Sequence, residues 1–177
     1  MSKLFELDPI VDEKVIKVII EISQGSYPVK YEVDKDLGAL VVDRIIPVAM
    51  HYPCNYGFIP STLGQDGDAL DALLISPYPI REMSLIDCRV IGALNMEDES
   101  GKDEKILVVP SDSVSKKYSH IKDIDSLEPY IKDQIKHFFE NYKGLENNKW
   151  VKVLDWTDSD EAMRMIDVSR KQYLESK

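Results

Sequence analysis

The stretch Val15-Ile16-Lys17-Val18-Ile19-Ile20-Glu21-Ile22 decides the class of fold. Six of its eight residues are β-branched, and such side chains fit the pleated, half-buried surface of a sheet. The segment that follows, Gln24-Gly25-Ser26-Tyr27-Pro28, contains a glycine and a proline that break the pattern. The stretch therefore predicts a β-strand that ends before residue 24.

Other short segments further along the first two-thirds of the chain share this character. Each is rich in strand-forming residues and is bounded by Gly, Pro, Asp or Asn. They lie at residues 30–33, 39–42, 72–75, 85–94 and 105–109. Strands this short and this often interrupted are typical of a small barrel.

The last third of the chain changes from the period of a strand to that of a helix. Apolar residues recur there at spacings of three and four, which places them on one helix face. They are Leu127, Ile131, Ile135, Phe138, Phe139 and Tyr142. Asp125 with Glu128 resembles a capping box, although Pro129 leaves the first residue of the helix open, and Gly144 supplies a stop.

A strand at residues 150–154 and a second helix at about 159–174 complete the predicted elements. Asp158 and Glu161 form the expected cap of that helix. Strands that come first and helices that come later predict one α+β domain, with helices packed on a curved or closed sheet. We take residues 1–177 as this single domain.

The charge balance of the chain disfavours some classes of function. The chain has 177 residues, with 22 Lys and Arg against 32 Asp and Glu, so its formal net charge is −10. This balance argues against a protein that holds nucleic acid or an anionic membrane by bulk electrostatics. Cys54 and Cys88 form no metal-binding or disulfide spacing, and residues 1–9 show no signal peptide. We expect two reduced, buried thiols and a cytoplasmic protein.

Asp66-Gly67-Asp68-Ala69-Leu70-Asp71 is the first dense acidic cluster. Its three carboxylates repel one another unless a cation compensates, and hard divalent cations such as Mg²⁺ prefer carboxylate oxygens. An exposed acidic turn is the alternative. An EF-hand loop that starts at Asp66 fails, because Pro77 falls at its twelfth position, where a carboxylate is required. A phosphatase with an aspartyl nucleophile is a weak match, because Leu63-Gly64-Gln65 precedes the motif instead of an apolar strand.

Residues 97–105 form a second acidic cluster between two predicted strands. On its own such a cluster is more often a solvated hairpin tip. Two acidic loops in one β-rich domain could also converge on one metal cluster, and the sequence alone does not show whether they meet. A third set combines cations with phenols in apolar or aromatic context, and these groups can clamp phosphate or, for the tyrosines, pack in the core. Its members are Lys30, Arg44, Tyr52, Tyr56, Lys105, Tyr142 and Lys143. Carboxylates for metal together with cations for phosphate indicate a metal–phosphate substrate.

Taken in order and spacing, these motifs resemble those of the family I soluble inorganic pyrophosphatases of the bacterial type. The resemblance runs from about Lys14 to Tyr173 and includes Asp43-Arg44, Tyr52-Pro53-Cys54-Asn55-Tyr56-Gly57 and the cluster 66–71. It implies a twisted five-stranded OB-like β-barrel with two main helices. It also implies Mg²⁺-dependent hydrolysis of pyrophosphate to two orthophosphates by a metal-bound water or hydroxide, several Mg²⁺ ions in each site, and a homohexamer.

The resemblance also implies roles residue by residue. Asp66, Asp71 and Asp103 match metal ligands, and Asp98 matches a further ligand used with substrate. Asp68 matches the group that takes the proton from the attacking water. Phosphate-binding positions match Lys30, Arg44, Tyr142 and Lys143, with Tyr56 beside the water, and supporting positions match Glu21, Glu32, Tyr52 and Lys105. Ala69 departs from the family's usual proline or glutamate, which affects the expected stiffness of the loop.

Two other classes of protein compete with this interpretation. One is an OB-like module that binds nucleic acid or a nucleotide without turnover, which the net charge and the lack of a basic stripe disfavour. The other is a catalytically dead relative, which requires a lost ligand, whereas every matched position is present. His51, His120 and His137 show no spacing typical of a transition-metal site, so we expect surface, core or subunit-contact roles for them.

Overall fold

Strand β2 spans Val15–Ile22, as the β-branched stretch predicts, in the computed structural model, which describes residues 2–177. Its side chains from Val18 to Ile22 are all buried. The other strands are β1 (Ile10–Asp12), β3 (Val29–Asp34), β4 (Ala39–Ile45), β5 (Asn55–Phe58), β6 (Asp71–Leu74), β7 (Leu85–Asp98), β8 (Gly101–Lys102), β9 (Lys105–Pro110) and β10 (Val151–Thr157). The helices are α1 (Ser2–Phe5), the 3₁₀ helix η1 (Ile124–Ser126), α2 (Pro129–Asn141) and α3 (Ser159–Glu175).

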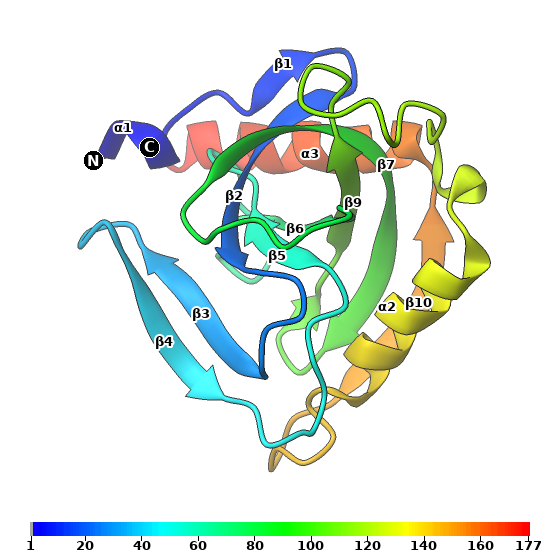
Figure 1. Cartoon of the computed structure of the whole chain (residues 1–177). Coiled ribbons are helices and arrows are strands. Elements are labelled where there is room, and N and C mark those ends of the chain that lie inside the picture. The colour runs from blue at the N-terminus through cyan, green and yellow to red at the C-terminus, as the bar shows by residue number, and fades with distance from the viewer. Residues whose placement is uncertain (1) are drawn as a thin grey trace.

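Five strands close into a ring, which confirms the prediction of a five-stranded barrel (Figure 1). The pairs β2–β5, β5–β6, β6–β9, β9–β7 and β7–β2 follow one another around it. All of these pairs are antiparallel except β6–β9, which is parallel. A closed ring leaves no unpaired strand edge among these five strands. At Gly57 a Cβ atom would lie 2.0 Å from the carbonyl oxygen of Ile19, so only glycine allows β5 to approach β2 this closely.

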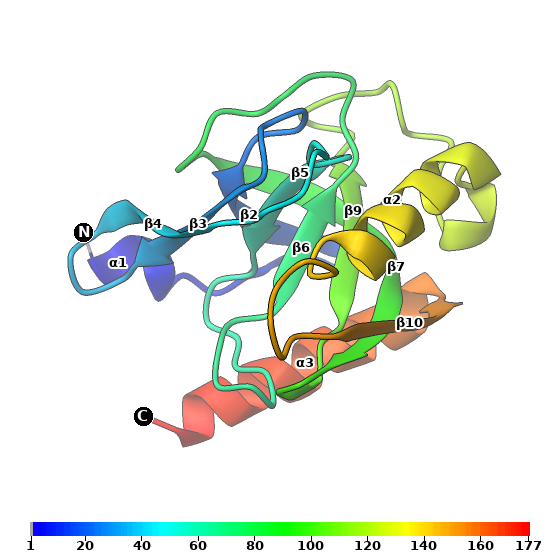
Figure 2. The same cartoon turned by 90° about the horizontal axis from the view of Figure 1, so that it is seen from below.

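Alternating residues of the ring contribute to two separate parts of the core. Ala72 and Leu74 of β6 join a cluster that includes Ala162 and Ile166 of α3. Leu73, which points to the opposite face of the strand, joins a cluster with residues of α2. Figure 2 shows α2 and α3 on separate sides of β10. The two predicted main helices therefore cover different parts of one sheet.

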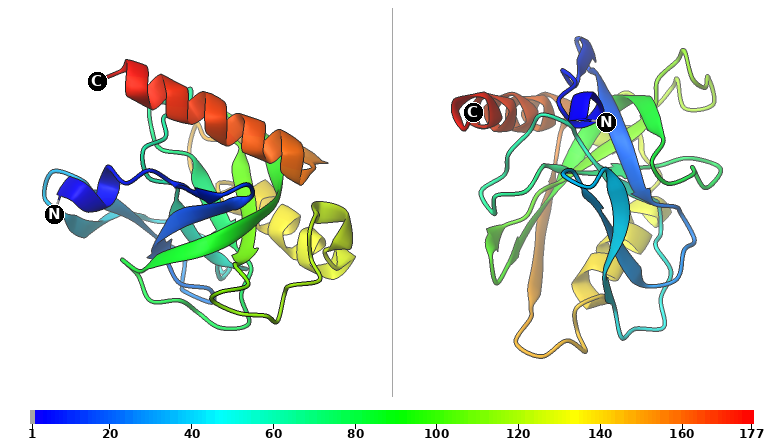
Figure 3. Two further views of the ribbon diagram at one scale, coloured as in Figure 1. Left: turned by 90° about the horizontal axis from the view of Figure 1, so that it is seen from above. Right: turned by 90° about the vertical axis from the view of Figure 1, so that its left-hand side faces the viewer.

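Strands β3 and β4 form a two-stranded sheet of their own beside the ring. This hairpin and α2 lie on opposite sides of the ring in Figures 1 and 3. Val33 is its one buried hydrophobic residue among those that the structure describes, so the hairpin contributes little to the core. Its position beside the ring matters mainly because it carries Lys30 and Arg44.

The start of α2 differs from the predicted capping box at Asp125 and Glu128. Asp123 caps the short η1, with its side chain accepting from the backbone N–H of Ile124. Helix α2 begins separately with Pro129, and Glu128 makes no side-chain cap bond. The capping-box prediction is therefore wrong, because a proline already begins the helix. At α3 the predicted cap is confirmed, since Asp158 Oδ1 accepts from the backbone N–H of Glu161 at 2.8 Å.

Several expectations about single residues are also confirmed. Cys54 and Cys88 are free and buried. His51, His120 and His137 are exposed. Among the helices of residues 2–177, none has both the length and the apolar character needed to cross a membrane.

Candidate active site

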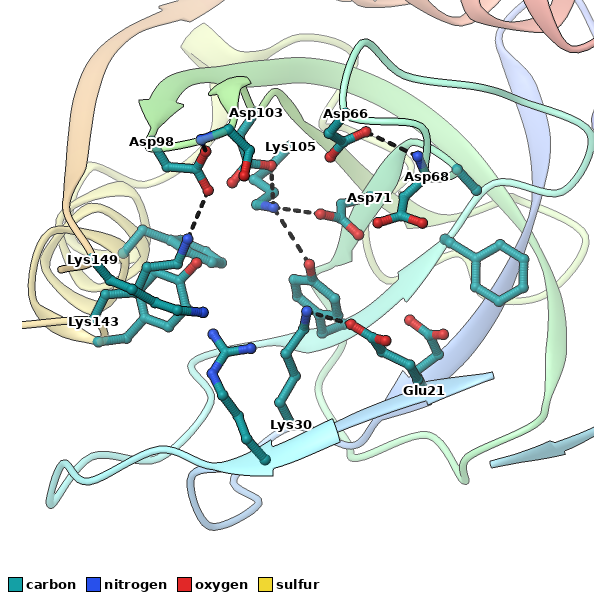
Figure 4. A pocket seen from close by; sticks show the side chains of 18 of the residues that line it. Glu21, Lys30, Asp66, Asp68, Asp71, Asp98, Asp103, Lys105, Lys143 and Lys149 are labelled. Atoms are coloured by element: carbon teal, nitrogen blue, oxygen red, sulfur yellow. Dashed lines mark hydrogen bonds and ion pairs between the residues drawn. The ribbon is translucent and has the colours of Figure 1, made fainter. Parts of the chain in front are cut away.

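A cavity of about 290 Å³ brings all of the predicted site residues together (Figure 4). It is lined by residues of the ring, the β3–β4 hairpin, α2 and the loop after α2. The predicted residues in its wall are Glu21, Lys30, Glu32, Arg44, Tyr52, Tyr56, Asp66, Asp68, Asp71, Asp98, Asp103, Lys105, Tyr142 and Lys143. The sequence therefore predicted the composition of this wall well. The individual roles of these residues stay predictions.

The two acidic clusters converge on this cavity, which the sequence left open. Asp66 and Asp68 lie in the loop before β6, where Gly67 has a φ of +90° and allows the tight turn. Asp71 is the first residue of β6. Asp98 ends β7, and Asp103 follows the short β8. The second cluster is thus a hairpin tip, as its alternative explanation held, and it also faces the same cavity as the first.

Lys105 lies between two of these carboxylates because of strand pairing. Asp71 and Lys105 are register partners on the parallel strands β6 and β9. The Lys105 ammonium bonds to Asp71 and, at 2.5 Å, to Oδ1 of Asp103, and its side chain is only 3% exposed. Burial alone would lower the pKa of Lys105, but the charges of Asp71 and Asp103 raise it well above its ordinary value. Lys105 therefore stays cationic.

The other cations reach the cavity from two separate elements. Lys30 and Arg44 are register partners on β3 and β4, so both point to one side of the hairpin. Lys143, in the loop after α2, donates to Oδ2 of Asp98 at 2.6 Å. Burial opposes ionisation of Asp98, but this bond and a backbone N–H lower its pKa overall. Figure 4 shows Lys143 and Lys30 across the cavity from Asp66.

The tyrosines of the wall belong to an aromatic cluster. Phe138 packs against Tyr52 and Tyr142 with ring centroids 4.9 and 5.5 Å apart. Lys105 Nζ lies 5.6 Å from the ring centroid of Tyr56 and 3.4 Å from its hydroxyl. Burial raises the pKa of Tyr52, Tyr56 and Tyr142. These phenols pack in the core and remain neutral donors at the cavity, so the two explanations for them hold together.

Asp68 has an environment different from that of the other carboxylates. Its side chain is exposed, yet the pocket wall partly desolvates the carboxyl group and raises its pKa. The neighbouring charges of Asp66 and Glu32 raise it further. Among residues 4–177, no ion pair joins Asp68 to a cation within 4.0 Å. A carboxylate with a raised pKa and no bonded ammonium has the properties of a proton acceptor.

Some residues of the wall were missed by sequence reasoning. Lys149 lines the cavity from the loop after α2, and Phe139 lines it from the helix itself. Phe139 was predicted only as part of an apolar helix face. Lys149 lies in a polar segment, Leu145-Glu146-Asn147-Asn148-Lys149, which carries no motif. Only the path of the loop between α2 and β10 shows that Lys149 lines the cavity.

Glu21 is buried at the back of the cavity. Its Oε1 accepts from the backbone N–H of Val33 on the hairpin at 2.8 Å. Burial, opposed by this bond, raises the pKa of Glu21 to about 8. Glu21 is therefore mostly protonated at neutral pH while it holds β3 to β2.

This shift predicts a pH-dependent stability. The unfolded chain loses the Glu21 proton near pH 4.5 and the folded chain near pH 8, so the contribution is fully present below pH 4.5 and is lost toward pH 8. The contribution of Glu21 to the free energy of unfolding should fall by about 1.36 kcal/mol per pH unit between these values. Urea unfolding in EDTA gives the free energy of unfolding at each pH. Between pH 5 and pH 8 this free energy should decline by roughly 3–4 kcal/mol less in Glu21→Gln than in the wild type.

The exposed Glu13 provides a matched control for this measurement. Glu13→Gln should follow the wild-type pH dependence at the same protein concentration. Parallel curves for wild type and Glu21→Gln would contradict the assignment of the buried proton to Glu21.

Comparisons with known proteins agree with the fold and identify the family. The family model described as inorganic pyrophosphatase matches residues 18–174. A Helicobacter pylori (strain J99) inorganic pyrophosphatase is 48% identical over 170 residues, which cover 96% of this chain and 98% of that protein. The inorganic pyrophosphatase of Escherichia coli K12 is 51% identical over 154 residues, covering 87% of this chain and 88% of its own.

Solved structures give the same result. A Helicobacter pylori inorganic pyrophosphatase superimposes with a TM-score of 0.91 at 46% identity, covering 96% of this chain and 99% of that chain. The Thermus thermophilus inorganic pyrophosphatase gives a TM-score of 0.89 at 42% identity, with coverages of 96% and 98%. The fold is thus that of a class of hydrolases. The chain belongs to the inorganic pyrophosphatase family, whose members are metal-dependent enzymes.

The donor set of the cavity fits a hard divalent cation. Eight carboxyl groups and six cationic side chains line it. Because Glu21 is mostly protonated at neutral pH, the seven other carboxylates leave a net charge of about −1. Within residues 2–177, no three His, Cys, Asp or Glu side chains are gathered at the spacing that would hold one metal ion. Asp71 and Asp103 are instead bonded to Lys105, and Asp98 is bonded to Lys143. Oxygen donors that face one cavity from two loops are nevertheless the ligands that Mg²⁺ prefers.

Proposed function

We propose that the protein hydrolyses inorganic pyrophosphate to two orthophosphates, with Mg²⁺ held by the acidic loops. One observation carries this proposal: two acidic loops and cations from two other elements line the same cavity. Pyrophosphate is a small polyanion, and a cavity with a net negative charge accepts it only with added positive charge. Asp66, Asp71 and Asp103 would hold Mg²⁺, with Asp98 as a further ligand.

The bound ions would neutralise charge on the substrate and lower the pKa of water from about 15.7 toward 7. Asp68 would accept the proton of the attacking water, because its raised pKa and its freedom from an ion pair suit a base. The oxygen of that water forms a bond to one phosphorus, and the bond from this phosphorus to the bridging oxygen breaks. The second orthophosphate leaves directly, so no covalent intermediate with the protein is formed.

Positioning is the main task of the other residues, since phosphoryl transfer leaves little covalent work for a protein. Arg44 can bond to two phosphate oxygens with its planar donors, and Lys30 and Lys143 act as point charges. Tyr56 and Tyr142 donate to phosphate without adding charge. Lys105 holds Asp71 and Asp103 in place, and Glu21, Glu32 and Tyr52 support the wall around them.

Release of phosphate from pyrophosphate by the purified protein with Mg²⁺ tests this proposal. We expect two phosphates for each pyrophosphate consumed and much slower release from p-nitrophenyl phosphate, because the cations are spread over both sides of the cavity. An Arg44→Ala protein, purified in the same way, reveals contamination by a host enzyme. Absence of release, or equal rates with the monoester, would overturn the proposal.

We also propose that the protein forms a homohexamer and acts in the cytoplasm as a single-domain enzyme. The family resemblance supports the hexamer, and so do large exposed apolar side chains such as Tyr27 and Ile45, which are 74% and 75% exposed. The binding partner is therefore a second copy of the chain, not nucleic acid or a membrane. Light scattering should give about 121 kDa, which is six times 20.2 kDa. A mass near 20.2 kDa would exclude the hexamer.

A further inference from the structure

Glu146 lies behind the cavity wall and holds one of its cations. It sits in the loop after α2, and its Oε2 accepts from Nε of Arg44 on β4 at 2.9 Å. The two residues are 102 positions apart in the chain, so this ion pair joins the loop to the β3–β4 hairpin. Glu146 itself is not part of the cavity wall, whereas Arg44 is.

The contacts of Arg44 leave one side of its guanidinium for a ligand. Glu146 bonds to Nε, and Asp43 Oδ2 accepts from Nη1 at 2.6 Å. Within residues 2–177, no hydrogen bond is made by Nη2 of Arg44. Because guanidinium is planar, fixing Nε and Nη1 also fixes the direction of the Nη2 donors. The orientation of Arg44 is therefore set by two carboxylates that approach it from different elements.

Burying Glu146 beside Arg44 costs folding free energy. Its side chain is only 12% exposed. Its second oxygen, Oε1, is buried with no hydrogen-bond partner in the part of the chain that the structure describes. A buried carboxylate oxygen without a donor destabilises the fold, so its presence calls for an explanation. Lys149, a second cation of the cavity wall, lies 3.7 Å from the same Oε2.

We propose that Glu146 is a positioning residue for substrate binding, which acts through Arg44 and secondarily through Lys149. This inference rests on the proposed function, since it takes Arg44 as a ligand of a phosphate group. Glu146 would not touch the substrate. It would hold the guanidinium in the orientation that presents Nη2 to the cavity, and so spare the substrate the cost of ordering that side chain.

The proposal predicts a specific pattern in the kinetics of pyrophosphate hydrolysis. Phosphate is anionic both in the bound substrate and in the transition state, so a misplaced Arg44 weakens binding of both. Glu146→Ala should raise KM roughly tenfold and change kcat by less than about threefold. Glu146→Gln, which keeps an acceptor for Nε but loses the charge, should raise KM by a smaller factor. It also serves if the alanine variant fails to fold.

A double-variant comparison separates positioning from a general structural role. In an Arg44→Ala background, Glu146→Ala should change KM by less than about twofold, because the residue through which it acts is gone. Glu140→Ala is the control, since Glu140 is exposed on α2 and, in the part of the chain whose side chains are described, its one ion pair is with Lys136 at 3.7 Å. It should leave KM unchanged. An unchanged KM in Glu146→Ala, or the same rise in the Arg44→Ala background, would overturn the proposal.

Binding can be measured without turnover, which keeps this test separate from that of the proposed function. In an Asp68→Asn background with Mg²⁺, calorimetric titration with pyrophosphate should give a Kd that Glu146→Ala raises roughly tenfold. A wild-type protein that binds pyrophosphate without hydrolysing it would overturn the proposed function alone. An equal Kd with and without Glu146→Ala would overturn the positioning role alone.

Discussion

Asp68→Asn is expected to lower kcat for pyrophosphate hydrolysis by roughly 10²- to 10⁴-fold, the usual contribution of a general base. KM should change by less than about threefold, because Asp68 makes no bond to the cations that would hold phosphate. The reason lies in its environment. Partial desolvation and the charges of Asp66 and Glu32 raise the pKa of Asp68, which favours uptake of a proton.

Initial rates at saturating Mg²⁺ across a range of pyrophosphate concentrations measure this effect. Asp125→Asn, at an exposed position outside the cavity, provides the matched control and should keep the wild-type rate. Full turnover of Asp68→Asn at saturating Mg²⁺ would show that another group accepts the proton.

The second large effect is expected for Asp71→Asn, which should act mainly through the metal. Replacing a carboxylate by an amide removes one negative ligand and weakens the attraction for Mg²⁺. It also leaves the buried Lys105 with Asp103 as its remaining bonded carboxylate. The Mg²⁺ concentration for half-maximal rate should rise roughly 10- to 100-fold, and saturating Mg²⁺ should restore much of the turnover.

Titration of the rate with Mg²⁺ at fixed pyrophosphate checks this expectation. Asp133→Asn, on the exposed face of α2, should titrate as the wild type does. A Mg²⁺ dependence of Asp71→Asn equal to that of the wild type would argue against Asp71 as a metal ligand.

Much of the fold could be predicted because local pattern and tertiary structure agree in it. The strand at Val15–Ile22 is β-branched and buried, so composition and burial point the same way. The predicted strands were wrong where pairing with a distant strand, and not the local sequence, determines whether a segment is a strand and where it ends. Strand β7 continues to Asp98 instead of ending near Leu94, because β8 and β10 pair with its polar end. Strand β5 was not predicted, since Asn55 and Gly57 are poor strand formers that nevertheless pair with β2 and β6.

In the candidate site, too, the local sequence predicted some features and tertiary structure determined the others. The residues that carry motifs were found, because acidic clusters and paired cations and phenols have a chemistry that is visible in one chain. That these residues lie close together could not be predicted, because it depends on how the strands pair. Strand pairing places Asp71 opposite Lys105, and Lys30 opposite Arg44. Glu146 and Lys149 carry no such motif, and only the course of the loop after α2 brings them beside Arg44 and Glu99.

We infer that this acidic protein hydrolyses a polyanion only when divalent cations neutralise the acidic cavity. The most direct test follows phosphate release from pyrophosphate in one sample, first with Mg²⁺, then after excess EDTA, and then after excess Mg²⁺ is restored. We expect the rate to fall to the buffer blank with EDTA and to recover when Mg²⁺ returns. A rate that EDTA leaves unchanged, or no phosphate release with Mg²⁺ at all, would contradict it.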